Sequence, residues 1–305
     1  MSTASPPVRR KRRNPILPYL LILPTFFFVV MFTAWPTLLA LYQSFFRQRL
    51  NIAKFREPAY IGLQNYTTLF HDPRFLLVLK NTLVYVLVTA PVSIILGFLF
   101  ALLIKRTVKG IGLARLAFFQ PTILPMVSAA TIWLFFFTPD YGLWNTFLQR
   151  LGYSGPQNWT GNPDLALIAI MIVGIWKNAG YYMIFYLAGM QNLPTDVYEA
   201  ATLDGANGWQ MLWKITFPLL RRTTLFVSTI AFIGAFQMVD HIFVLTKGGP
   251  SRASTVLLYY LWQTRFENQD VGKASAITII LILFLLIFTV TNFALSEQKE
   301  EKTHA

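Results

Sequence analysis

The chain has 305 residues, of which 55% are hydrophobic and only 13% are charged. A soluble domain carries roughly 25% charged residues, so this composition, with a mean hydropathy of +0.50, excludes an ordinary soluble protein and indicates a membrane protein. The formal net charge is +13, and the absence of cysteine excludes disulfides, thiolate metal sites and cysteine chemistry.

The N-terminus is strongly basic and leads directly into a long apolar run. Arg9-Arg10-Lys11-Arg12-Arg13 precedes the apolar residues 17–41. That run is longer than the apolar core of a signal peptide, and no Ala-x-Ala cleavage site with polar flanks follows it. We therefore expect an uncleaved first membrane helix that follows a basic cytoplasmic tail, residues 1–16.

Further along the chain, more segments are long enough to cross a bilayer, which takes about 20 apolar residues. Counting the first, the six predicted spans are 17–41, 81–104, 116–138, 165–190, 223–246 and 274–295. Several contain proline, which membrane helices tolerate where neighbouring groups satisfy the freed backbone. The pattern predicts an all-α integral membrane protein with a transmembrane domain over 17–295 and a C-terminal tail over 296–305.

Six spans place both termini on the same side of the membrane. Lys and Arg residues number 14 on that side and 11 on the other, and Lys177 lies within a span. Cytoplasmic loops carry an excess of basic residues, and the first helix usually dominates the orientation. The N-terminal cluster therefore predicts cytoplasmic termini, with the loops 47–80, 139–164 and 247–273 outside. Basic residues beside apolar runs suit orientation by membrane lipid, so nucleic acid is not an expected partner.

The cytoplasmic loop 191–222, between the fourth and fifth spans, predicts two short helices around a turn. Thr195 is expected to cap the first helix, and Asp196 favours its positive end. Gly205 can end it in a left-handed conformation. The second helix, 207–222, is too apolar for a solvated loop. We infer a helix pair that docks into a partner protein.

The same loop carries a motif through which the sequence resembles the permeases of ABC importers. The motif is Glu-Ala-Ala, three residues, Gly, nine residues and Ile-x-Leu-Pro. The chain has Glu199-Ala200-Ala201, Gly205 and Ile215-Thr216-Phe217-Pro218, with Phe217 in place of the usual Leu. The flanking segments 191–194 and 243–250 resemble the carbohydrate-uptake branch, which includes the maltose, glycerol-phosphate and lactose permeases. The resemblance covers about 60–292.

The resemblance implies a type I ABC importer permease of the bacterial inner membrane. It would form a heterodimer with a second permease and work with two ATPase subunits and a periplasmic or lipid-anchored solute-binding protein. It would translocate a sugar or a related polar solute by alternating access. The sequence has no Gly-x-x-x-x-Gly-Lys-Ser/Thr element, so ATP and Mg²⁺ would be bound by the ATPase, and the chain itself would be neither an enzyme nor a cofactor protein. The implied ATPase-coupling residues are Glu199, Ala200, Ala201, Asp204, Gly205, Ile215 and Pro218.

Lys177 is the most informative single charge. A lysine at the centre of a span costs roughly 2.5–3.5 kcal/mol on insertion scales, so a polar neighbour or a watery cavity is expected. Either Lys177 and Asn178 face the solute path, or Lys177 pairs within the protein or snorkels. The aromatic rings of Trp176 and Tyr181 suit a sugar, and helix packing explains them equally well. The resemblance to maltose-type permeases implies solute contacts at Gly174, Lys177, Asn178, Tyr181, Thr122 and Met126.

Two other classes of function remain as alternatives. An ion-coupled secondary transporter would need inverted repeats and carboxylates in the membrane. The sequence shows no such repeat, and Asp240, near the outer end of the fifth span, is the only acid within a span. We expect a gating or interfacial role for Asp240 and its neighbour His241. A membrane enzyme would need a clustered Ser/His/Asp or metal-ligand set, which the sequence lacks.

Overall fold

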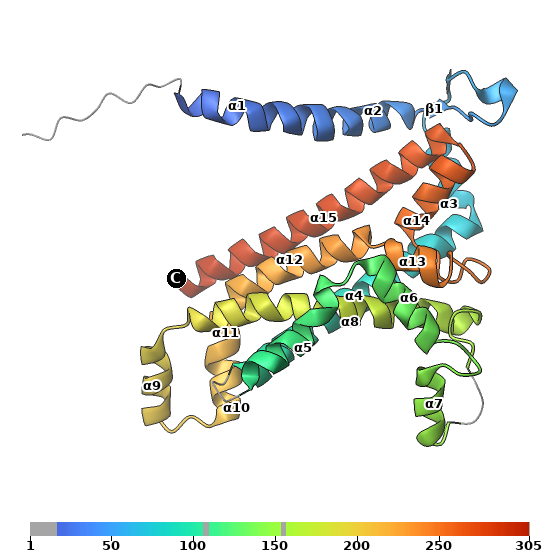
Figure 1. Cartoon of the computed structure of the whole chain (residues 1–305). Coiled ribbons are helices and arrows are strands. Elements are labelled where there is room, and N and C mark those ends of the chain that lie inside the picture. Colours follow the sequence, from blue (N-terminus) through green and yellow to red (C-terminus); the bar gives the residue numbers. More distant parts are fainter. Residues whose placement is uncertain (1–16, 106–109, 154–156, 305) are drawn as a thin grey trace, which may run out of the picture.

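The computed structural model describes residues 17–105, 110–153 and 157–304 (Figure 1). The basic tail 1–16 and part of the predicted cytoplasmic loop after the second span, 106–109, lie outside the described residues. The described chain is almost wholly helical. Its one sheet pairs β1 (Phe46–Arg47) with β2 (Ala59–Tyr60) in antiparallel register.

Among the described residues, five helices or nearly continuous helix groups are long and apolar enough to cross a membrane, and there are six if one bent helix pair is counted as a single broken span. This confirms the predicted all-α membrane architecture. The spans are α1 and α2 (Leu17–Val29 and Trp35–Gln43), α4 (Pro73–Ile104), the bent pair α5 and α6 (Ile111–Ile123 and Met126–Phe136), α8 (Pro163–Gln191), α12 and α13 (Arg221–Gln237 and Asp240–Leu245) and α15 (Val271–His304).

Short helices connect these spans. On the loops predicted to be outside they are α3 (Gln64–His71), α7 (Leu143–Arg150) and α14 (Leu257–Trp262). In the loop 191–222 they are α9 (Thr195–Leu203), α10 (Gly208–Gln210) and α11 (Phe217–Leu219), with a π-helical segment, Met211–Thr216, between the last two. Figure 1 shows α9 and α10 projecting from one end of the helix bundle, whereas β1, α3, α7 and α14 lie at the other end.

The third span differs from the prediction. Instead of one helix over 116–138, the chain forms α5 and α6 with a bend of 101° between them. Pro125 has no backbone N–H and disfavours a helical conformation in the residue before it. Leu124 is accordingly extended, with φ −65° and ψ 136°. The break therefore follows from Pro125, which the prediction had treated as a tolerated proline within one span.

The interior of the bundle lies mainly between α4 and α8, which share the most extensive contact between two helices of the described chain. One cluster of buried apolar residues lies towards α3 and α14, and includes Phe75, Ile170 and Ile277. A second lies towards the loop 191–222, and includes Tyr186 and Leu220. The two clusters position α8 as the central helix of the fold, because both draw residues from it.

The first span stands apart from this interior. Figure 1 shows α1 and α2 as one long helix that meets the rest of the chain only near β1. No residue of Tyr19–Gln43 is buried, whereas 56% of the residues in the most apolar stretch of α8 are buried. The start of α1 and the end of α15 lie at the same end of the bundle as α9 (Figure 1), as six crossings require.

Candidate functional site

The loop predicted to dock into a partner begins with α9. The helix ends in a Schellman motif, in which the N–H of Ala206 donates to the carbonyl of Ala201 (2.9 Å) and the N–H of Gly205 to that of Thr202 (3.1 Å). Gly205 has φ +76°, which confirms its predicted left-handed conformation. The predicted N-cap is wrong, because Thr195 is already helical and its hydroxyl donates to Asp196.

The second helix of the loop starts with a capping box. Oδ1 of Asn207 accepts from the N–H of Gln210 (2.9 Å), and Oε1 of Gln210 accepts from the N–H of Asn207 (3.0 Å). The prediction of one helix over 207–222 is only partly right. The segment passes through the π-helical residues 211–216 and is interrupted at Leu220, where ψ is 6°.

Several side chains of this pair project away from the rest of the chain. Glu199 and Asp204 are exposed, and Leu203 and Trp209 expose 89% and 70% of their surfaces. A shallow, open hollow of about 430 Å³ lies among Tyr198, Glu199, Thr202 and Leu203. An apolar surface of this kind beside a membrane is typical of a protein interface.

Other residues of the loop attach it to the spans. The Tyr198 hydroxyl lies 2.9 Å from that of Thr216, and the ammonium of Lys105 sits 4.8 Å from the Tyr198 ring. The Phe217 ring meets Phe98 of α4 edge-on, at 6.0 Å between centroids. Ala201 is buried, whereas Ala200 is exposed. Ile215 is half-buried and Pro218 is exposed. The two short helices thus form a unit with one face on the bundle and one face free.

Two of the predicted solute-path residues meet residues of α4. Asn178 lines a polar cavity of about 10 Å³, large enough for no more than one water. Gly174 is buried so close to Tyr85 that a β-carbon there would lie 2.5 Å from the tyrosine hydroxyl. The polar α4 residues of this cavity were not predicted from the sequence, although they recur at helical spacing in an apolar span. They are Tyr85, Thr89 and Ser93.

The ammonium of Lys177 points to the break in the third span. It donates to the carbonyls of Pro121 (2.8 Å), Thr122 (3.0 Å) and Leu124. Of the two interpretations left open, the structure shows an internal partner for this amine. Asp240 is exposed at the start of α13.

The remaining predicted solute-path residues are spread over two helices. Trp176 is half-buried and packs edge-on against Trp133 of α6, with 5.6 Å between ring centroids. Tyr181 packs in the same way on Phe185 (5.0 Å). Met126 contacts the apolar cluster that includes Ile170. The described structure therefore brings Lys177 and Thr122 together, and it places Trp176 and Tyr181 in separate aromatic contacts.

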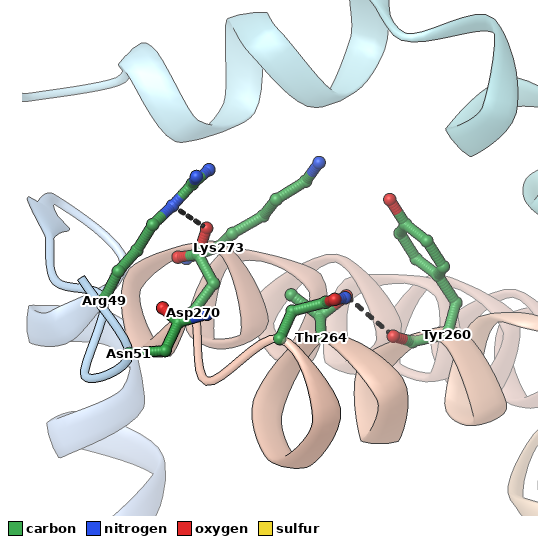
Figure 2. Close-up of a pocket in the computed structure, with 7 residues that line it drawn as sticks. Arg49, Asn51, Tyr260, Thr264, Asp270 and Lys273 are labelled. Carbon is green, nitrogen blue, oxygen red and sulfur yellow. Dashed lines mark hydrogen bonds and ion pairs between the residues drawn. The ribbon is translucent and has the colours of Figure 1, made fainter.

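A second polar site lies at the opposite end of the bundle from α9. Figure 2 shows Arg49, Asp270 and Lys273 around a pocket of about 200 Å³. Nε of Arg49 donates to Oδ2 of Asp270 (2.7 Å), and Lys273 lies 3.7 Å from Asp72. The backbone N–H of Val271 donates to the carbonyl of Gln48. These contacts tie the loop after the first span to the start of α15.

His241 is fully buried at the start of α13. Its Nε2 lies 3.2 Å from the hydroxyl of Tyr85, which the sequence analysis did not connect with it. The described residues contain no group of three or more His, Cys, Asp or Glu residues able to hold a metal ion. The contact joins α13 to α4 beside the polar cavity.

Solved structures share this fold. The chain resembles a bacterial ABC transporter involved in the import of the acidic polysaccharide alginate, with a TM-score of 0.79, 24% identity and coverage of 92% of this chain and 95% of that one. It matches, with the same score, an alginate transporter in complex with an alginate pentasaccharide-bound periplasmic protein. The likeness shows that this chain shares its fold with a chain of those transporters.

Sequence comparison gives the family. The model of the binding-protein-dependent transport system inner membrane component matches residues 81–298. The sn-glycerol-3-phosphate permease protein UgpA of Agrobacterium fabrum is 33% identical, over 94% of this chain and 96% of that protein. The trehalose/maltose permease protein MalF of Thermococcus litoralis is also 33% identical, over 92% of this chain and 93% of that protein. The chain therefore belongs to the family of binding-protein-dependent transport system inner membrane components.

Proposed function

We propose that the chain is the permease subunit of an ATP-driven importer for a sugar or a related polar solute, working by alternating access. The observation that carries the proposal is the helix pair of the loop 191–222. It presents Glu199 and Leu203 on a free face, and its other face contacts Lys105 and Phe98 at the end of the second span. An ATPase that binds the free face can move the spans through this unit. The coupling residues are Glu199, Ala200, Ala201, Asp204, Gly205, Ile215 and Pro218.

The unburied first span supports a second permease subunit. Because this helix packs on its own chain only near β1 and α15, most of its apolar surface is available to a neighbour. In the proposed assembly this chain and a second permease form a heterodimer on two ATPase subunits, which bind ATP and Mg²⁺. Residues 17 and 304, at the two ends of the described chain, face the cytoplasm together with the helix α9. The opposite end receives a solute-binding protein. A solved alginate transporter of the same fold is in complex with an alginate pentasaccharide-bound periplasmic protein.

The relatives support the class of solute. Their names specify glycerol-3-phosphate, trehalose or maltose, and alginate, which are all polyol or sugar compounds. The cavity of about 10 Å³ beside Asn178 is too small for a sugar, so the solute path must open by movement of the spans. The path candidates are Gly174, Trp176, Asn178, Tyr181, Thr122 and Met126. Lys177 lies among them, with its amine held by backbone carbonyls.

Reconstitution into liposomes tests the proposal. The chain is assembled with its partner permease, ATPase and solute-binding protein, and uptake of radiolabelled maltose, trehalose, glycerol-3-phosphate and alginate oligosaccharide is measured. We expect uptake of at least one probe only with ATP on the ATPase side. An ATPase variant that lacks its phosphate-binding lysine serves as the control. Uptake driven by a proton or sodium gradient without ATP would instead show a secondary transporter.

A further inference from the structure

We propose that Lys177 is a positioning residue that holds the break in the third span, so that α8 and the α5–α6 pair move together. Its ammonium occupies the cation site that the C-terminus of α5 creates in the membrane. Lys177 then acts on transport through α5 and α6, and its amine is not a ligand of the solute. The effect on transport rests on the proposed function, whereas the effect on the bend does not.

The hydrogen bonds of Lys177 leave it no donor to spare. A lysine ammonium has three N–H donors and no acceptor. The carbonyls of Pro121, Thr122 and Leu124 accept from Nζ of Lys177, which matches that number. A solute hydroxyl or phosphate could therefore bind this amine only by displacing a backbone carbonyl.

The break needs such a donor. The last four carbonyls of a helix have no partner within it, and the C-terminus carries partial negative charge. Pro125, just beyond the end of α5, has no N–H to offer. In a membrane, unsatisfied backbone groups are costly, and broken helices often bind free cations at such ends. In this chain the cation is the ammonium of Lys177, a side chain of α8.

Two further contacts fasten α8 to α5 at the same level. Oγ1 of Thr122 donates to the carbonyl of Lys177 (3.3 Å). Gly180, one turn along, lies so close that a β-carbon would sit 1.9 Å from the carbonyl oxygen of Phe118. Because α8 runs into the loop that carries α9, a displacement of α9 is transmitted along α8 to the break.

The first test measures the bend itself. The sequence has no cysteine, so spin labels can be placed at Leu113 of α5 and Phe135 of α6, which are 74% and 53% exposed. Pulsed electron spin resonance on the full chain is expected to give one narrow distance in the parent protein and a broad, shifted distribution in Lys177→Met. Lys177→Arg, which keeps several donors, should retain the narrow distance. The exposed Lys80→Met is the matched control and should match the parent.

The second test restores the ammonium chemically. In the reconstituted importer, Lys177→Cys should lower the uptake rate about tenfold or more, without changing the solute concentration that gives half-maximal uptake. Treatment with 2-bromoethylamine converts the cysteine to a near-isostere of lysine and should restore uptake. Treatment with 2-iodoethanol gives a neutral side chain of similar length and should not. The cysteine-free parent, treated identically, controls for other modification.

The two tests separate the possible failures. An unchanged bend in Lys177→Met would show that Lys177 does not hold the break and would overturn the proposal. A raised half-saturating solute concentration with an unchanged maximal rate would show that Lys177 is a solute ligand and would also overturn it. Recovery with iodoethanol would also contradict it. If Lys177→Met does not assemble, loss of the narrow distance in an assembled Lys177→Arg protein is the contradicting result. If even the parent importer shows no uptake, the proposed function fails while the bend measurement still decides the role of Lys177.

Discussion

The loop 191–222 and the break in the third span are both bends in the chain, and they are stabilised in different ways. The turn of the loop is held by partners three to five residues apart, such as Ala206 with Ala201 and Asn207 with Gln210. The break is held by Lys177, whose carbonyl partners lie 53 to 56 positions away. The loop can therefore keep its shape as a unit while it moves, whereas the break depends on how α8 is placed.

Reversing the charge on the free face of the loop should have the largest effect. In Glu199→Lys the loop keeps its own hydrogen bonds. An ATPase surface that accepts the Glu199 carboxylate would meet a lysine ammonium instead, and juxtaposed like charges cost several kcal/mol. We expect uptake to fall at least about tenfold while membrane insertion is normal. The measurement is ATPase activity stimulated by loaded solute-binding protein. Glu57→Lys, at another exposed acid, is the control. Normal stimulation in Glu199→Lys would contradict the coupling role.

A small change at the α5–α8 contact tests the other region. Gly180→Ala forces a methyl group against the carbonyl of Phe118, and overpacking of this kind costs about 1–3 kcal/mol. Gly234→Ala, in α12, meets nothing within 4 Å and is the matched control. We expect a lower thermal unfolding midpoint in detergent for Gly180→Ala alone. Equal midpoints would mean that α5 and α8 are not tightly packed there.

The turn of the loop allows a matched comparison between two glycines. Gly205 has φ +76°, a conformation that is strained for a β-branched residue by about 1–3 kcal/mol. Gly208 is helical, and a β-carbon there meets nothing within 4 Å. Gly205→Val should therefore reduce co-purification of the ATPase, and Gly208→Ala should not. Equal retention of the ATPase by both would show that the turn does not set the docking surface.

Loss of the helix cap should give the smallest change. Asn207→Ala removes the acceptor for the N–H of Gln210, which typically costs about 1 kcal/mol. The loop should bind the ATPase several-fold more weakly in a titration, with little change in maximal uptake. An effect as large as that of Glu199→Lys would show that Asn207 itself contacts the ATPase.

The contrast also explains what the sequence could predict. The all-α membrane architecture, the left-handed Gly205 and the family follow from hydropathy, local turn chemistry and motif spacing, and all three are confirmed. The break at Pro125 and the partners of Lys177 depend on how helices pack, which no local pattern specifies. For the same reason the polar residues of α4 beside Asn178 were missed. The roles of the coupling and solute-path residues stay predictions.

The loop 191–222 is proposed to be a cytoplasmic docking element for an ATPase. Single cysteines at Asn207 and Tyr153, both exposed, test it by labelling with a membrane-impermeant maleimide in intact cells and in inverted vesicles. We predict that the cysteine at 207 labels only in inverted vesicles and is protected when the ATPase is bound, and that the cysteine at 153 labels only in intact cells. Labelling at 207 from outside, or no protection by the ATPase, would contradict the account.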